Sequence, residues 1–218
     1  MRTTSFGQDR QLTFVDRLGV WLSLRKIRHS VGDLARRRVA DFGCGFEARF
    51  ATSVVDRVEQ MVLVDVSIAP LVRAHPKVRA IEGSLPDAIS GLEGASLDVV
   101  VCISVLEHLQ NPTLMLSEIE RVLVPGGLAV LNVPTWFGKR LLEFAAFRLR
   151  LAPAEEMDDH KTYYDPRDLW PLLVAAGFLP HNISCRRHKF GMNTFAVCEK
   201  SAPAGSLGTN GATRSVGK

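Results

Sequence analysis

The sequence predicts an α/β protein built on a doubly wound, mostly parallel sheet. Short apolar runs alternate with segments of helical periodicity between residues 38 and 133, which is the rhythm of parallel strands joined by helices. The run Leu97–Ile103 is apolar almost throughout, as expected for a strand that is covered on both faces. The run at residues 38–42 passes directly into a glycine turn, and open α/β sheets bind ligands at such strand ends.

The composition fits a single globular domain. The chain has 218 residues, of which 46% are hydrophobic and 23% are charged, so it can bury a substantial core. We expect one domain over residues 13–200, between a disordered N-terminus (1–12) and a disordered tail (201–218) that is rich in small residues. The net charge of +4 does not by itself require nucleic acid, and we expect none as a partner. Residues 1–7 carry no charged-then-apolar leader, so we expect a cytoplasmic protein.

The first expected element is a basic amphipathic helix. Apolar positions recur at helical spacing from Phe14 to Leu34, and arginine and lysine fill much of the remainder. This helix either covers the sheet and exposes a solvated basic face, or meets a membrane or nucleic-acid surface. We favour the first interpretation.

The glycine turn carries the strongest chemical signal. It reads Asp41-Phe-Gly-Cys-Gly45, and Ala48 completes a G-x-G-x-x-A pattern. Glycine adopts positive φ readily and lets a ligand approach the backbone. The second apolar run ends at Asp65, about 20 positions after Gly45, where an acid is placed to accept hydrogen bonds from ribose hydroxyls. The pattern indicates a nucleoside-binding unit, and a solvated loop aspartate is the alternative for Asp65.

The alternation continues through the middle of the chain. We expect helices near residues 48–55, 68–73 and 112–122, and further strands at 78–83, 97–103 and 128–133. The rhythm is then interrupted by a lid insertion at about residues 135–165, whose residues 139–150 form a second basic amphipathic helix. A helix at 168–176 follows, and the last two runs, 182–190 and 193–199, should form an antiparallel pair.

No metal centre is predicted. None of the four cysteines belongs to a C-x-x-C pair or groups with histidine, and cysteine within apolar runs usually behaves as a small hydrophobe. Glu107 and His108 are adjacent potential ligands, but no third ligand is evident.

Several stretches together resemble the class I S-adenosylmethionine-dependent methyltransferases, which have a Rossmann-like fold. They are the Asp41–Gly45 turn, the acid Asp65, the run from residue 97 that ends Val-Leu-Glu-His-Leu, and Leu-Val-Pro-Gly-Gly-Leu at 123–128. Looser similarity continues through His-Lys-Thr-Tyr-Tyr at 160–164 and Ala-Ala-Gly-Phe at 175–178. The resemblance implies a seven-stranded sheet with an antiparallel last strand, and S-adenosyl-L-methionine as the cofactor.

The resemblance also implies roles for particular residues. Asp41 and the glycine turn would hold the methionine end of the cofactor, Asp65 would bind the ribose hydroxyls, and Val66 would pack on the adenine. The position after the third strand is often acidic in this family but is Ser84 here, so contact with the adenine amino group would fall to the backbone. The full implied set is Asp41, Gly43, Cys44, Gly45, Asp65, Val66, Ser84, Leu85, Ile103 and Ser104.

Two histidines are candidate catalytic residues. Methyl transfer requires that the acceptor be held near the methyl carbon, and a hydroxyl acceptor also requires a base. His108 follows the fourth strand, and His160 follows the inserted helix beside Tyr163 and Tyr164. A structural role at the start of a helix is an equally good interpretation of His108.

The sequence therefore predicts an S-adenosylmethionine-dependent enzyme. The favoured reaction is O-methylation of a small-molecule, glycan or lipid-linked acceptor. The alternatives are an NAD(P)-dependent oxidoreductase, whose glycine turn and downstream acid are similar, and a non-catalytic scaffold. The basic segments at residues 14–28 and 139–150 would suit peripheral contact with a membrane that carries a lipid-linked acceptor. Burial of their apolar faces on the sheet or in a homodimer is the favoured alternative.

Overall fold

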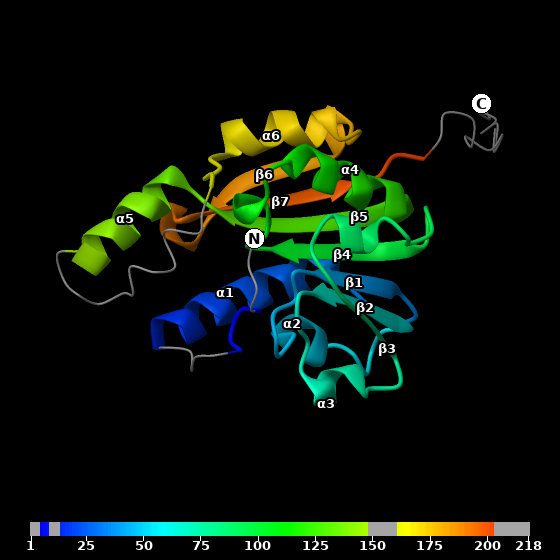
Figure 1. Cartoon of the computed structure of the whole chain (residues 1–218). Helices are drawn as coiled ribbons and strands as arrows, with labels where there is room; N and C mark the ends of the chain where they lie inside the picture. The colour runs from blue at the N-terminus through cyan, green and yellow to red at the C-terminus, as the bar shows by residue number, and fades with distance from the viewer. Residues whose placement is uncertain (1–4, 9–13, 148–160, 203–218) are drawn as a thin grey trace, which may run out of the picture.

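A seven-stranded sheet forms the centre of the molecule in the computed structural model, with the strand order β3-β2-β1-β4-β5-β7-β6 (Figure 1). The structure describes residues 5–8, 14–147 and 161–202. The strands are β1 (Arg38–Phe42), β2 (Gln60–Asp65), β3 (Val78–Glu82), β4 (Leu97–Ile103), β5 (Leu123–Pro134), β6 (Ile183–His188) and β7 (Asn193–Glu199). The helices are α1 (Phe14–Val31), α2 (Arg49–Thr52), α3 (Pro70–Arg73), α4 (Pro112–Val122), α5 (Trp136–Phe147) and α6 (Pro166–Ala175).

The strand pairing confirms the predicted fold class. Strands β1 to β5 pair in parallel, whereas β7 is antiparallel to both of its neighbours, β5 and β6. Since the carboxyl ends of parallel strands meet at one edge of a sheet, the turns after β1, β2, β4 and β5 lie along the same edge. This carboxyl edge is where the candidate site is built.

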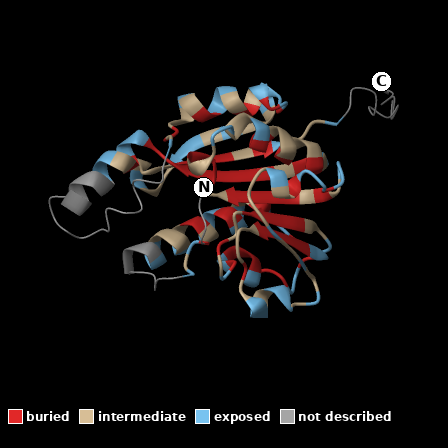
Figure 2. Ribbon diagram, viewed as in Figure 1, coloured by how far each residue is buried: buried red, intermediate tan, exposed pale blue. Residues whose placement is uncertain are grey.

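Helices cover both faces of the sheet, and each face has its own apolar core (Figure 1). Alternate residues of β1 divide between the cores, with Val39 packing on the side of α1 and α2, and Phe42 on the side of α4 and α6. Figure 2 shows that the central strands are buried almost throughout. Burial on both faces explains why the sequence of β4 is apolar except at Asp98.

Local capping fixes the two helices on the α4 and α6 side. Asn111 precedes α4 and accepts a hydrogen bond from the Leu114 amide at 3.1 Å, while Pro112 occupies the first turn. Asp165 precedes α6 and exchanges hydrogen bonds with Asp168 in a capping box. These caps explain why both helices begin within two residues of the predicted positions.

Two elements differ most in extent from the sequence prediction. Strand β5 begins at Leu123 rather than at residue 128, because backbone hydrogen bonds hold the glycine turn within the strand. The Gly126 amide donates to the Lys200 carbonyl at 2.7 Å, and the Lys200 amide donates to the Gly127 carbonyl at 2.9 Å. Helix α2 is shorter than the expected 48–55, and its N-cap Ala48 is buried at a φ of 42°.

The expectations for the two ends of the chain fall largely outside the described residues. The same is true of residues 148–160, within the expected lid. Within the described ranges, no helix combines the length and the apolarity needed to cross a bilayer.

Candidate functional site

Four polar or lining residues of the carboxyl edge share one face of the sheet. The register pairs Asp41 of β1 with Leu63 and Val101. Leu63 and Val101 belong to the core on the α1 side, so Asp41 points to that face as well. Two positions further along the neighbouring strands stand Asp65, Ile103 and Asn132, on the same face because side chains alternate along a strand. The sheet therefore brings together Asp41, Asp65 and Ile103, which the sequence placed in the site.

The glycine turn after β1 is fastened to the end of β2. Gly43 and Gly45 have φ values of 77° and 74°, a backbone conformation that glycine adopts without the steric cost of a Cβ. The amides of Gly43 and Cys44 both donate to the Val64 carbonyl, at 2.8 and 3.3 Å. A Cβ on Gly43 would lie 2.2 Å from Cγ2 of Val105. The turn thus requires glycine at position 43 for packing within the protein, which the sequence did not show.

Asp41 is a buried carboxylate whose negative charge is not offset by a described neighbour. Its side chain is 3% exposed, and no described residue donates a hydrogen bond to it. Burial raises the pKa of Asp41 to about 7, and the nearby charge of Asp65 acts in the same direction. A carboxylate in this position would be stabilised by a cation at the sheet edge, so the site has the chemistry to hold an ammonium group.

Asp65 is extensively hydrogen-bonded. The Gly45 amide donates to its Oδ2 at 2.8 Å, and the Val66 amide donates to its Oδ1 at 2.8 Å. The Ser5 hydroxyl also donates to Oδ1. The two amides orient the carboxylate toward the glycine turn, and the contact with Ser5 occupies acceptor capacity on the same carboxylate.

The contact with Ser5 belongs to a short N-terminal segment, residues 5–8, that lies on the glycine turn. Ser5 is 5% exposed, and its hydroxyl accepts a hydrogen bond from the Ser67 amide at 3.0 Å. The Phe46 amide donates to the Phe6 carbonyl at 3.0 Å, and that carbonyl lies 3.2 Å from the position of a Cβ on Gly45. Sequence reasoning missed this segment, because nothing in its polar composition indicates where it docks.

The remaining predicted cofactor residues divide into two groups. Cys44 and Val66 flank the two carboxylates, and burial raises the pKa of the Cys44 thiol far above its usual range, so that thiol is not a nucleophile. Ser84 and Leu85 follow β3, and Leu85 packs partly against the core on the opposite face. Among the described residues, neither Ser84 nor Leu85 shares a hydrogen bond with Asp65.

Asn132, at the end of β5, is a candidate site residue that the sequence did not single out. The Ser104 amide donates to the Asn132 carbonyl at 2.8 Å, and Ser104 is exposed at a φ of 54°. Asn132 is fully buried, and neither its side-chain oxygen nor its nitrogen has a hydrogen-bond partner. A buried amide normally finds partners, so Asn132 is a candidate contact for a bound molecule. Its signal in the sequence is a lone polar residue within an apolar strand.

His108 lies in a turn that is tied to the segment after the lid. It ends the 3₁₀ turn η2 (Leu106–His108), and its amide donates to the Val105 carbonyl at 3.0 Å. The Lys161 amide donates to the Glu107 carbonyl at 2.8 Å, which anchors residue 161 beside this turn. His160 itself lies outside the described residues. The structure therefore locates His108 at the carboxyl edge and leaves the prediction for His160 open.

An aromatic cluster stands at the start of α5. The rings of Trp136 and Tyr163 have centroids 5.4 Å apart, and the Lys139 ammonium lies 5.7 and 5.4 Å from them. Thr135 joins this region to the β6–β7 turn, because its hydroxyl donates to the Gly191 carbonyl at 2.7 Å and accepts from the Gly138 amide at 2.9 Å. The two rings are tilted by 46°, and Tyr163 is buried whereas Trp136 is exposed. The exposed Trp136 ring with its nearby cation is therefore the part of the cluster suited to a planar acceptor.

The described part of the chain contains no group of three potential metal ligands. The expectation of a metal-independent site remains a prediction for the whole chain.

Comparisons with known proteins find relatives among the methyltransferases. A family model described as "Methyltransferase domain" matches residues 40–131. This range includes the glycine turn, Asp65 and His108, and it ends one residue before Asn132.

Two relatives extend the match beyond that range. A ubiquinone biosynthesis O-methyltransferase of Aeromonas salmonicida is 28% identical over 163 residues, covering 70% of this chain and 67% of the relative. A probable S-adenosylmethionine-dependent methyltransferase of Mycolicibacterium smegmatis is 30% identical over 149 residues, covering 66% of this chain and 52% of the relative. The chain thus spans between about half and two thirds of the length of these relatives.

A solved structure shares the fold at low sequence identity. The S-adenosylmethionine-dependent methyltransferase from Archaeoglobus fulgidus superposes with a TM-score of 0.64 at 16% identity, covering 84% of this chain and 94% of the other. This likeness concerns the fold alone.

Proposed function

Because this chain belongs to the class I S-adenosylmethionine-dependent methyltransferases, we propose that it methylates a hydroxyl group on an apolar small-molecule or lipid-linked acceptor. The observation that carries the proposal is the pair of carboxylates at the carboxyl edge: Asp41 is buried without a donor, and Asp65 is held by the glycine turn. S-Adenosylmethionine supplies an electrophilic methyl group when it is bound, and this chain's residues hold and orient it.

The residues present fit this cofactor. We assign Asp41 to the ammonium of its methionine end, since a cation would offset the burial of that carboxylate. Asp65 would accept the ribose hydroxyls, and Val66 would pack on the adenine. Ile103 and Ser104 would line the site from the end of β4. The backbone at Ser84 and Leu85 would accept a hydrogen bond from the adenine amino group.

Ser5 competes with the ribose for Asp65 in this proposal. Its hydroxyl already donates to Oδ1, and the amides of Gly45 and Val66 take further acceptor positions on the same carboxylate. Contact of both ribose hydroxyls with Asp65 therefore requires that Ser5 leave. The N-terminal segment would exchange between a docked position and a released one as the cofactor site fills.

The acceptor would lie between the end of β5 and the start of α5. Asn132 offers a buried amide that can orient a polar group, and the exposed ring of Trp136, which packs against the buried Tyr163, offers a surface for a planar one. His108 lies at the same edge, where it could remove the proton of a hydroxyl acceptor, and His160 is the alternative base. Relatives named for O-methylation in ubiquinone biosynthesis support a hydroxyl acceptor.

Exposed apolar side chains support an acceptor with an apolar portion. Leu18 and Trp21 of α1, Phe137 and Leu141 of α5, and Phe190 of the turn between β6 and β7 are all exposed. Helix α5 and the β6–β7 turn lie side by side, since a Cβ on Gly191 would be 3.7 Å from the Phe137 ring. Basic residues accompany them, and the Arg25 guanidinium lies 5.7 Å from the Trp21 ring. Such a surface suits peripheral contact with a membrane, although a homodimer could also cover it.

Two acceptors test the proposal. We expect the full chain to release S-adenosylhomocysteine when it is given S-adenosylmethionine and a catechol. The KM for a catechol that carries a prenyl chain should be lower than the KM for the plain catechol by about tenfold or more. The product should carry the methyl group on oxygen. Methylation of neither compound, or equal KM values for the two, would argue against an apolar hydroxyl acceptor.

A further inference from the structure

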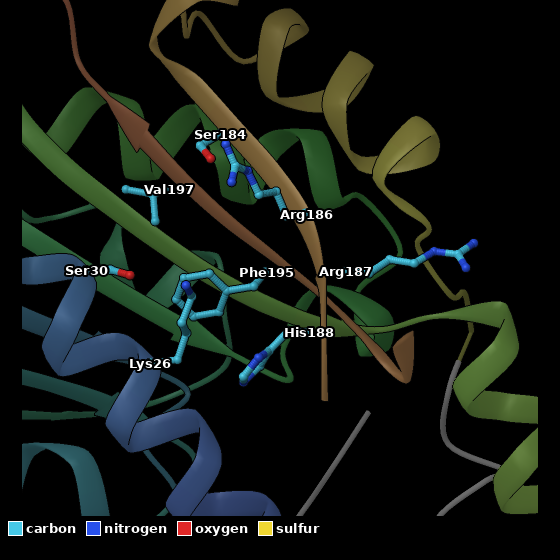
Figure 3. Close-up of a pocket in the computed structure, with 8 residues that line it drawn as sticks. All are labelled: Lys26, Ser30, Ser184, Arg186, Arg187, His188, Phe195 and Val197. Carbon is cyan, nitrogen blue, oxygen red and sulfur yellow. The ribbon is translucent and has the colours of Figure 1, made fainter. Parts of the chain in front are cut away.

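A second concave region lies away from the two carboxylates, between α1, the edge strand β6 and its neighbour β7 (Figure 3). Its volume is about 370 Å³. Lys26 and Ser30 line it from α1, Ser184, Arg186 and His188 line it from β6, and Phe195 and Val197 form an apolar floor on β7. The groove is too large for water alone and is of a size that suits a small organic ligand.

The groove gathers positive charge and contains no acid. Its lining residues include lysine, arginine and histidine but no aspartate or glutamate. The Lys26 ammonium lies 5.7 Å from the centroid of the Phe195 ring, and the His188 ring lies 5.6 Å from it. His188 Nε2 is buried and has no hydrogen-bond partner. Lys26 and His188 thus lie beside the same aromatic ring, and the charges of Lys26 and Arg186 would attract an anion into the groove.

A further cation lies near His188, outside the residues that line the groove. Lys189 follows His188, and its ammonium nitrogen lies 3.8 Å from the position of a Cβ on Gly19 of α1. Burial lowers the pKa of Lys189 to about 8, and burial together with the charges of Lys189 and Lys26 lowers the pKa of His188. The folded state thus disfavours the protonated forms of His188 and Lys189. A bound anion would favour these forms and raise both pKa values.

Alternation along β6 separates the groove from its neighbour Arg187. Ser184, Arg186 and His188 share the face toward α1, whereas the Arg187 guanidinium turns away and lies 3.7 Å from Asp165 (Figure 3). Arg187 is also among the residues that line the groove, but its guanidinium has a carboxylate partner of its own. It therefore provides a charge-matched control on the same strand.

We propose that the groove formed by Lys26, Arg186 and His188 binds a phosphoryl group, with the remainder of the ligand lying on Phe195 and Val197. The guanidinium and the ammonium supply charge-assisted donors, and the hydroxyls of Ser30 and Ser184 supply neutral ones. The same chemistry would serve a free phosphorylated compound or the headgroup of an anionic lipid. This site does not depend on the assignment of the methyl acceptor.

Titration with inorganic diphosphate at constant ionic strength tests the site. We expect saturable binding to the full chain by isothermal titration calorimetry, and a loss of affinity of about tenfold or more in the double variant Lys26→Gln, Arg186→Gln. Arg187→Gln should lose less than about twofold. Both substituted side chains are exposed, so the variants should fold, and unchanged binding of S-adenosylmethionine would confirm this separately from the diphosphate result.

Vesicles distinguish the two sources of the phosphoryl group. If the ligand is a lipid headgroup, the wild-type chain should sediment with phosphatidylglycerol vesicles, diphosphate should release it, and the double variant should stay in the supernatant. If the ligand is a free compound, wild type and double variant should sediment alike while the difference in diphosphate affinity remains. The proposal is overturned if diphosphate binds without saturation, or if Arg187→Gln weakens its binding as much as the double variant does.

Discussion

Burial and the neighbouring Asp65 raise the pKa of Asp41 to about 7, so the folded chain holds a carboxylate that is only partly ionised near neutral pH. An acid whose pKa is higher in the folded state than in the unfolded state favours folding when it is protonated. Its contribution to stability is full below the unfolded pKa of 3.8 and is lost as pH rises through about 7. Asp41 therefore destabilises the free protein under the conditions in which it would be ionised to bind a cation.

Asp41→Asn should separate stability from binding. The amide is neutral at all pH values, so we expect the free energy of unfolding to rise by about 1–3 kcal/mol at about pH 8 and to be nearly unchanged at about pH 4. Urea denaturation at the two pH values measures this change. A variant that is less stable than wild type at pH 8 would mean that the carboxylate has a partner that stabilises it.

Ser5 and Asp65 should have opposite effects on cofactor affinity. Asp65→Ala should lose about 1.5–3 kcal/mol of binding free energy, the range for a hydrogen bond to a charged group. Ser5→Ala should bind S-adenosylmethionine about three- to tenfold more tightly, because a larger fraction of the protein has its N-terminal segment released. Ser96→Ala, which removes a hydroxyl that donates to Glu93, is the control in calorimetry. Weaker binding by Ser5→Ala would show that the segment completes the site rather than competing for it.

Gly43 shows what a sequence motif can and cannot reveal. The pattern predicted that glycine is needed there so that a ligand can approach the backbone, and the positive φ agrees with a glycine requirement. A Cβ added at position 43, however, would collide with the Val105 side chain. A bulky residue at position 43 would thus disturb the protein's own packing, so loss of binding in such a variant would not by itself locate the cofactor.

At the scale of elements, hydrophobic periodicity predicted most of the strands and helices. Strand β4 and helix α4 have the predicted bounds, because an apolar run covered on both faces and a proline at a helix start are strong local signals. The extension of β5 depends on hydrogen bonds with Lys200, and the docking of residues 5–8 depends on Asp65 and Phe46. Pairings between residues so distant in sequence leave no periodic pattern, so sequence reasoning could not find them.

The junction between β5, α5 and the β6–β7 turn should be sensitive to small substitutions. A Cβ on Gly138 would lie 2.3 Å from the Met192 carbonyl oxygen, a backbone atom that already accepts from the Thr135 amide. We expect Gly138→Ala to lower the free energy of unfolding by about 1–3 kcal/mol. Gly91→Ala is the matched control, since nothing lies within 4 Å of its Cβ position, and it should change stability by less than about 0.5 kcal/mol. Equal effects in urea denaturation would contradict the close packing.

At the scale of the whole molecule, α5 and the β6–β7 turn carry exposed aromatic side chains beside the carboxyl edge, where β5 ends. The sequence indicated basic amphipathic segments on α1 and α5, but it did not indicate that the turn at Phe190 joins α5. That neighbourhood is set by the Thr135 and Gly191 contact, which spans distant parts of the chain. The groove at Lys26 and Arg186 was missed for the same reason, since its lining comes from the first helix and the last two strands.

Phe190 offers a sharp test of the apolar surface. Its side chain is 91% exposed at the carboxyl edge, and Leu71 of α3 is 90% exposed on a different element. Phe190→Ser should raise the KM for the prenylated catechol about threefold or more, and Leu71→Ser should leave it unchanged. Equal KM values in steady-state assays of the two variants would place the acceptor's apolar portion elsewhere.

Calorimetric titration of the full chain at about pH 8 tests the central claim most directly, because it compares S-adenosylmethionine with NAD on the same protein. The account predicts saturable binding of S-adenosylmethionine, no binding of NAD, and a loss of affinity of about tenfold or more in Asp41→Asn even though that variant is at least as stable as wild type. Saturable binding of NAD instead, or S-adenosylmethionine bound equally well by wild type and Asp41→Asn, would contradict it.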